Sequence, residues 1–158
     1  MIVADTNLLV YLFIESDFTV GAQQVHSLDP DWVFPPIAIS EASNVLVTLV
    51  REKHITSETA SEALRRIEKH VMAGLREVSM KAVLELAIQR NISAYDAQFI
   101  VLADLLGIYL VTEDGKLKRT FPDKALSMEA FAGLSRGRTI QETRAPYRAR
   151  RAQRRSHS

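Results

Sequence analysis

The chain opens with MIVADTNLLVYLFI (residues 1–14), the stretch on which the fold prediction rests. A short apolar run at residues 2–4 ends at Asp5, and from Thr6 to Ile14 apolar side chains recur at helical spacing. This pattern predicts a buried strand that passes directly into a helix. Asp5 would then stand where the strand ends and the helix begins.

The same alternation of strand and helix runs through the following sequence. The apolar runs at 32–34, 75–78, 108–111 and 125–128 predict further strands, and helical periodicity separates most of them. Alternating strands and helices favour a parallel sheet covered on both faces. We expect an α/β fold, a three-layer α/β/α sandwich with a central, mainly parallel sheet.

Helix starts are marked by polar residues. Ser79 and Ser93 precede helical patterns that end near Asn91 and Gly107. A helix over residues 56–72 has Thr59 and Glu62 at capping-box spacing. A further helix is expected after the Pro35-Pro36 pair.

Length and composition narrow the class of protein. A chain of 158 residues with 47% apolar side chains suits one globular domain. The absence of cysteine excludes disulfides, thiolate metal sites and cysteine nucleophiles. Its apolar stretches are shorter than the ~20 residues that span a bilayer, and no signal peptide is recognisable. We expect a soluble cytoplasmic protein without a membrane partner.

Charge is distributed unevenly along the chain. Residues 136–158 hold eight arginines and one glutamate, a net charge of 8 − 1 = +7, so the other 135 residues carry 12 − 18 = −6. We therefore expect a domain at residues 1–133 and a flexible arginine-rich tail at 134–158. A solvated terminus is the favoured interpretation of the tail. The alternative is phosphate contact with RNA, for which the candidates are Arg148, Arg150, Arg151, Arg154 and Arg155.

Four acidic residues stand out, although each has an ordinary explanation. Asp5 could cap the first helix, and the negative charge of Glu41 could be stabilised by the positive end of its helix dipole. Asp96 lies three residues after Ser93, as in a capping box, and Asp114 precedes a glycine, as in a turn. Taken singly, each acid is explained better by local structure than by function.

Their predicted positions change that balance. In a parallel α/β sheet, strand ends and the starts of the following helices share the edge where ligands bind. Four carboxylates gathered there would repel one another unless some are protonated or a cation neutralises them. Oxygen ligands favour Mg²⁺ or Mn²⁺ over zinc. We interpret His26, His54 and His70 as surface or core residues, because none has a paired ligand nearby in sequence.

An ordered set of short motifs resembles the PIN-domain ribonucleases, and most closely the VapC-type toxins of bacterial toxin–antitoxin pairs. The resemblance covers about residues 1–133. Each motif alone is weak, whereas the ordered set is specific. The motifs are Val3-Ala4-Asp5-Thr6-Asn7, Ser40-Glu41-Ala42, Ser93-Ala94-Tyr95-Asp96-Ala97 and Leu110-Val111-Thr112-Glu113-Asp114.

The resemblance implies a role for each matching residue. Asp5 and Asp96 would bind the metal, and Glu41 and Asp114 would complete the acidic pocket directly or through water. Behind them, Thr6, Asn7 and Thr112 would hold these carboxylates or the water in place. The implied activity is hydrolysis of phosphodiester bonds in RNA by a Mg²⁺- or Mn²⁺-dependent endoribonuclease.

The resemblance also implies partners: an RNA substrate, a second copy of the chain in a homodimer, and a cognate antitoxin protein. Apolar helix faces at 45–50 and 67–71 could serve such contacts, although core packing explains them as well. Two alternatives stay open. One is a PIN-like module that binds RNA or protein without catalysis, and the other is an RNA-processing nuclease without a toxin role.

Overall fold

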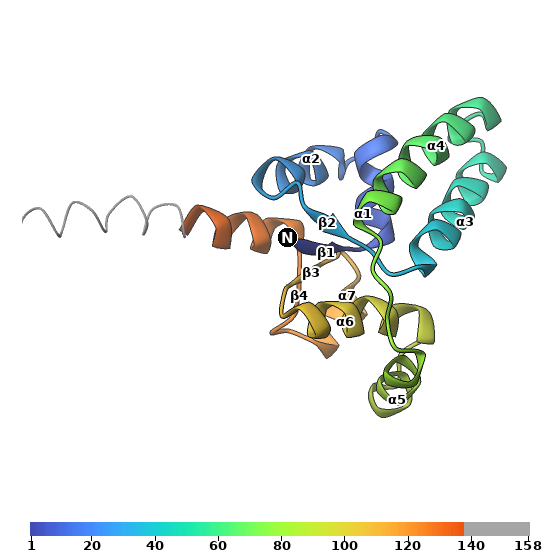
Figure 1. Cartoon of the computed structure of the whole chain (residues 1–158). Helices are drawn as coiled ribbons and strands as arrows, with labels where there is room; N and C mark the ends of the chain where they lie inside the picture. The colour runs from blue at the N-terminus through green and yellow to red at the C-terminus, as the bar shows by residue number, and fades with distance from the viewer. Residues whose placement is uncertain (138–158) are drawn as a thin grey trace, which may run out of the picture.

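The computed structural model describes residues 1–137, which form an α/β fold with a four-stranded parallel sheet (Figure 1). The elements are β1 (Ile2–Ala4), α1 (Thr6–Phe13), α2 (Thr19–Leu28), β2 (Trp32–Val33), α3 (Ile37–Arg51), α4 (Ser57–Gly74), α5 (Met80–Arg90), α6 (Ala94–Leu106), β3 (Leu110–Val111), α7 (Gly115–Thr120) and β4 (Ala125–Leu126). Residues 128–137 form a further helix. The predicted fold class is confirmed.

The sheet has the strand order β2-β1-β3-β4. At its centre β1 pairs in parallel with β2, through Val3 and Val33, and with β3, through Ala4 and Val111. These four residues are fully buried, which explains the short, wholly apolar runs in the sequence, because strands covered on both faces have no polar side.

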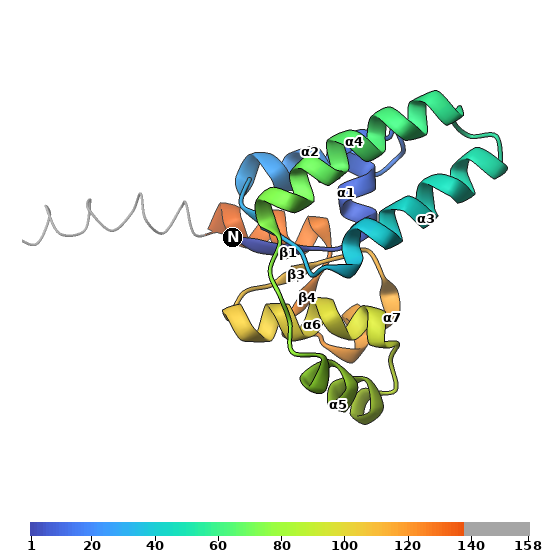
Figure 2. The same ribbon diagram turned by 45° about the vertical axis from the view of Figure 1, so that its right-hand side comes forward.

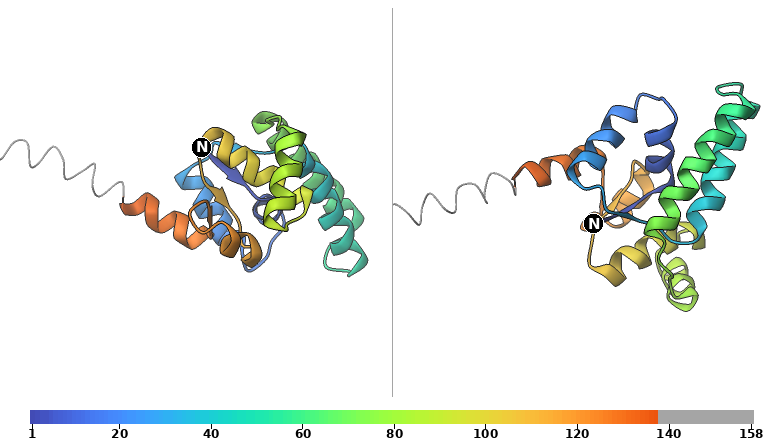
Figure 3. Two further views of the ribbon diagram at one scale, coloured as in Figure 1. Left: turned by 90° about the horizontal axis from the view of Figure 1, so that it is seen from below. Right: turned by 45° about the horizontal axis from the view of Figure 1, so that its top comes forward.

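Helices cover both faces of the sheet. The first four, α1 to α4, lie on one side, and α6 with α5 behind it lies on the other (Figures 2 and 3). On the first side, Leu8 and Leu9 of α1 are buried in the core, and on the second side Ile100 and Leu102 of α6 are buried. Within residues 1–137, no helix has both the length and the apolar character needed to cross a membrane.

The caps of α5 and α6 follow the sequence signals, whereas the cap of α4 does not. Ser79 and Ser93 accept hydrogen bonds from backbone N–H groups three residues further on, and Asn91 ends α5 in the left-handed conformation. The capping box predicted at Thr59 and Glu62 is wrong. Instead, Thr56 caps α4 by accepting from the Thr59 backbone N–H, because the helix begins at Ser57 and Thr59 already lies in its first turn.

The strand predicted at residues 75–78 does not form. Leu75 makes a single parallel bridge to Phe34, in which the Phe34 N–H donates to the carbonyl of Gly74 and the Arg76 N–H donates to the carbonyl of Phe34. Beyond this bridge the chain crosses from α4 to the other side of the sheet (Figure 1). It leaves the sheet because Ser79 begins α5 almost at once.

The helix at residues 128–137 continues past position 133, where the apolar pattern ends. Phe131 and Ala132 anchor it in the core, at 8% and 6% exposure. The domain boundary at residue 134 stays a prediction. The five arginines proposed to contact RNA, between Arg148 and Arg155, lie outside the described residues.

We predict that Gly74→Ala destabilises the protein. A Cβ atom at this position would lie 2.0 Å from the Trp32 carbonyl oxygen, so the end of α4 would have to move away from β2. We expect a loss of about 1–3 kcal/mol in the free energy of unfolding, measured by urea denaturation. Gly133→Ala is the matched control, because its added methyl meets open space and helix propensity favours alanine by up to about 1 kcal/mol. Equal stability of the two variants would contradict the prediction.

Candidate active site

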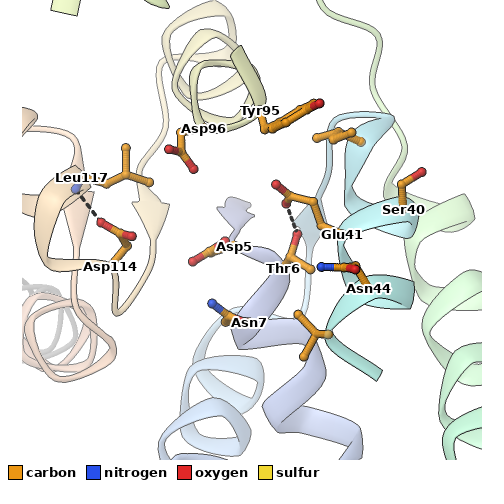
Figure 4. A pocket seen from close by; sticks show the side chains of 12 residues that line it. Asp5, Thr6, Asn7, Ser40, Glu41, Asn44, Tyr95, Asp96, Asp114 and Leu117 are labelled. Carbon is orange, nitrogen blue, oxygen red and sulfur yellow. Dashed lines mark hydrogen bonds between the residues drawn. The ribbon is translucent and has the colours of Figure 1, made fainter. Parts of the chain in front are cut away.

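A cavity of about 500 Å³ opens where the carboxyl ends of β1 and β3 meet helices α3 and α6 (Figure 4). The structure brings together there six of the seven residues that the resemblance assigns to the acidic pocket and its support. Those that line the cavity are Asp5, Thr6, Asn7, Glu41, Asp96 and Asp114. The seventh, Thr112, lies directly behind Asp5 and is fully buried.

Asp5 occupies the capping position of α1 without acting as a side-chain cap. Its Oδ2 atom instead accepts a 2.6 Å hydrogen bond from the hydroxyl of Thr112. That hydroxyl oxygen also accepts from the Asp114 N–H at 3.0 Å. Thr112 thus joins the acids that follow β1 and β3. The cap explanation of Asp5 does not account for its contacts.

Glu41 is the fifth residue of α3, beyond the first turn in which a helix dipole acts strongly. Its Oε2 atom accepts a 2.7 Å hydrogen bond from the hydroxyl of Thr6, the first residue of α1 (Figure 4). The two threonine hydroxyls therefore have the same role toward different carboxylates: Thr112 orients Asp5, and Thr6 orients Glu41.

Asp96 and Asp114 retain structural roles and also line the cavity. The Asp96 N–H donates to the Ser93 hydroxyl, which fixes the first turn of α6. At Asp114 the predicted turn is wrong: the residue caps α7, and its Oδ1 atom accepts from the Leu117 N–H at 2.8 Å. Asp114 has an extended backbone and caps the helix that begins at Gly115. The Asp-Gly pair therefore marks the start of α7 and not a turn.

The carboxylates interact electrostatically. Burial raises the pKa of Asp5, and the negative charges of Asp114 and Asp96 add to this effect against the lowering by the Thr112 hydrogen bond. Burial likewise raises the pKa of Glu41, with contributions from Asp5 and Asp96. A positive ion in the cavity would relieve this repulsion.

The donor set of the cavity fits a hard divalent cation. Its charged lining consists of carboxylate oxygens, and no histidine of residues 1–137 takes part. His26 and His70 instead pack around Trp32, with ring centroids 5.2 and 5.8 Å from its ring, and His54 pairs with Glu52 on the surface. Among the described residues, no three acidic or histidine side chains are already gathered as a metal centre. The chemistry of the donors matches Mg²⁺ or Mn²⁺.

Three polar residues in the cavity were not assigned from the sequence. Ser40 and Asn44 lie on the same face of α3 as Glu41, and Tyr95 precedes Asp96 in α6 (Figure 4). Helical spacing was the available signal, because positions 40, 41 and 44 share one helix face. Asn7 is exposed at the cavity, and no hydrogen bond within residues 1–137 connects its side chain to a carboxylate. Its supporting role stays a prediction.

Comparison with known proteins identifies the family. The profile of the PIN domain matches residues 2–121, so the chain belongs to the PIN domain family. PIN domains have a nuclease fold that is common among the toxins of toxin–antitoxin pairs, and they generally use divalent metal ions. No curated protein sequence matches the chain significantly.

Solved structures share the fold. The crystal structure of PAE2754 from Pyrobaculum aerophilum aligns with a TM-score of 0.66 at 20% identity, over 85% of this chain and 88% of that one. A toxin–antitoxin complex from Klebsiella pneumoniae contains a chain that aligns with a TM-score of 0.54 at 19% identity, over 77% of this chain and 90% of that one. At these identities the likeness concerns the fold.

We predict that Asp5→Asn stabilises the metal-free protein increasingly as the pH rises. Because the pKa of Asp5 is raised on folding, the folded state binds more protons than the unfolded state between the ordinary pKa and the raised one. The free energy of unfolding therefore falls as the pH rises through that window. Asparagine removes this loss of stability, so the Tm of the variant in EDTA should exceed that of the wild type by a gap that widens as the pH is raised above the ordinary pKa of aspartate.

The gap isolates Asp5 because other titrating groups are common to both proteins. Burial lowers the pKa of His70, which makes the free energy of unfolding rise with pH, opposite to the effect of Asp5. Both proteins contain His70, so its effect largely cancels in the difference between their Tm values. Glu68→Gln, which changes an exposed carboxylate of α4, is the matched control. Each kcal/mol shifts the Tm of a chain of this size by about 2–5 °C. A gap independent of pH would show that Asp5 carries no such destabilising charge.

Proposed function

We propose that the protein is a divalent-metal-dependent endoribonuclease that hydrolyses phosphodiester bonds in RNA and acts in the cytoplasm as the toxin of a toxin–antitoxin pair. The observation that carries this proposal is the convergence of Asp5, Glu41, Asp96 and Asp114 on one cavity. These acids come from four separate segments of the chain. Two of them are held by buried or partly buried threonine hydroxyls.

The carboxylates would hold Mg²⁺ or Mn²⁺, with Asp5 and Asp96 as the main ligands. When bound, such an ion activates water for attack and neutralises charge on the phosphate. Thr112 keeps the Asp5 carboxylate aimed at the cavity, and Thr6 does so for Glu41. Burial raises the pKa of Glu41, which makes it a stronger base than an exposed glutamate, so it is suited to accept the proton of the attacking water.

The toxin role draws support from the motif resemblance and from the fold shared with the Klebsiella pneumoniae complex. An antitoxin needs a surface on which to dock. Of the apolar helix faces considered for this, Ile67 and Val71 are fully buried and serve the core. Leu46, Val47 and neighbouring residues instead line an apolar cavity of about 350 Å³ between α3 and α4. We propose this cavity as the better antitoxin contact, and we also propose a homodimer.

The arginine tail would supply phosphate attraction that the acidic body lacks. The body outside residues 136–158 carries a net charge of −6, which repels RNA, whereas the segment itself carries +7. Such attraction is independent of base sequence and weakens with salt. We propose Arg148, Arg150, Arg151, Arg154 and Arg155 as its contacts.

We predict metal-dependent cleavage of single-stranded RNA by the purified protein. EDTA should abolish cleavage, and added Mg²⁺ or Mn²⁺ should restore it. Asp5→Asn and Asp96→Asn should each lower the rate by more than about 100-fold, because they remove metal ligands. Thr112→Val should lower it by about 10- to 100-fold, as is typical when support for a ligand is lost. The cleavage rates under each metal condition and for each variant are measured by gel analysis of end-labelled RNA.

The control for this assay is Glu68→Gln, which changes a carboxylate outside the cavity and should retain the wild-type rate. Cleavage that persists in EDTA, or in both aspartate variants, would refute the site. A protein that binds RNA without cleaving it under any metal condition would favour the non-catalytic module.

We predict that expression of the wild-type chain in bacteria arrests growth and that Asp96→Asn does not. Arrest should be relieved by co-expression of the protein encoded beside it, because an antitoxin would cover the acidic cavity. Growth is followed by optical density, with equal expression checked by immunoblot. Normal growth at high levels of active enzyme would instead favour an RNA-processing nuclease.

A further inference from the structure

The cavity has no cationic side chain among its described lining residues. An RNA phosphate entering it faces four carboxylates, and a metal ion can offset this repulsion only near the ion. Within the cavity itself, affinity for the nucleotides beside the reacting phosphate would therefore come from uncharged contacts. Such contacts are concentrated on the Glu41 side of the cavity, where α3 and α6 face each other (Figure 4).

Tyr95 is the aromatic residue on that side. Its side chain is 61% exposed, and within residues 1–137 no hydrogen bond or ring contact engages the phenol. Burial in the core therefore does not account for a tyrosine here. The backbone that carries the ring is nevertheless fixed, because Tyr95 lies in the first turn of α6, where the Ser93 hydroxyl accepts from the Asp96 N–H.

Ser40 and Asn44 line the cavity from α3, one on each side of Glu41 in the sequence. Both are exposed, and no described residue forms a hydrogen bond with either side chain. The amide of Asn44 can donate and accept at once, and the hydroxyl of Ser40 can do either. Paired donors and acceptors of this kind match the edge of a nucleobase.

We propose that Tyr95, Ser40 and Asn44 form a nucleoside-binding subsite for one unstacked base of single-stranded RNA beside the reacting phosphate. The base stacks on the Tyr95 ring, and its edge meets the α3 side chains. In a duplex the same base is already stacked and paired, so the subsite selects single strands or loops. The inference rests on the proposed ribonuclease function and adds to it the part of the substrate that this face of the cavity recognises.

The first test measures binding of a fluorescein-labelled RNA hexamer to the full chain by fluorescence anisotropy in EDTA, where metal-dependent cleavage is absent. Loss of one stacking contact weakens binding by about 5- to 150-fold. Tyr95→Ala should show a loss in this range, whereas Tyr95→Phe and Tyr95→Trp should bind as the wild type does. Leu105→Ala is the matched control, because Leu105 is 68% exposed on the same helix and lies outside the cavity lining.

The second test removes the base instead of the ring. In hexamers with an abasic site at successive positions, one position should lose as much affinity for the wild type as Tyr95→Ala loses with intact RNA. At that position the two changes together should cost no more than either alone. Asn44→Ala should reduce the difference in affinity among the four bases there. Under Mg²⁺, Tyr95→Ala should raise KM more than it lowers kcat.

The outcomes separate this inference from the proposed function. Unchanged binding by Tyr95→Ala, or additive losses at every abasic position, would overturn the subsite even if the wild type cleaves RNA. Tyr95-dependent binding at one position by a protein that never cleaves would support the subsite and refute the nuclease. An equal loss in Tyr95→Phe would also overturn the stacking role, since phenylalanine keeps the ring.

Discussion

The parallel pairing of β1 with β3 is the constraint on which the rest of the site depends. Its register sets Ala4 beside Val111, so the next residues of the two strands, Asp5 and Thr112, emerge side by side. The hydroxyl of Thr112 then reaches the Asp5 carboxylate, although 107 positions separate them in the chain. From Thr112 the chain passes directly to Asp114 and α7. Two acids of the cavity are thus placed by one strand pair.

The acidic cavity represents a compromise between stability and chemistry. Burial and neighbouring charges raise the pKa values of Asp5 and Glu41, so their ionised forms oppose folding. Two threonine hydroxyls offset part of this cost while they orient the carboxylates. A cation bound among these mutually repelling carboxylates would lower their electrostatic energy. Membership of the PIN family agrees with a cation-binding site.

The proposals divide substrate binding among three parts of the chain. Carboxylates and metal would act on the reacting phosphate, and the tail arginines would attract the backbone without regard to sequence. Tyr95, Ser40 and Asn44 would then read one base through uncharged contacts. Because only the last set can distinguish bases, specificity would reside on the face of the cavity between α3 and α6, which is separate from the metal ligands.

The sequence by itself predicted strands at residues 2–4, 32–34, 108–111 and 125–128, and the structure forms them over residues 2–4, 32–33, 110–111 and 125–126. It also predicted the caps at Ser79 and Ser93, because apolar runs and capping residues act locally. It also placed four acids on one edge, since strand ends of a parallel sheet share that edge. Local signals failed at residues 75–78 and at Asp114, where the next helix start decided the conformation. Only the tertiary structure decided which hydroxyl meets which carboxylate and that Tyr95 lines the same cavity as Ser40 and Asn44. Those contacts join distant segments, and their geometry follows from sheet register and helix packing, for which no local pattern exists.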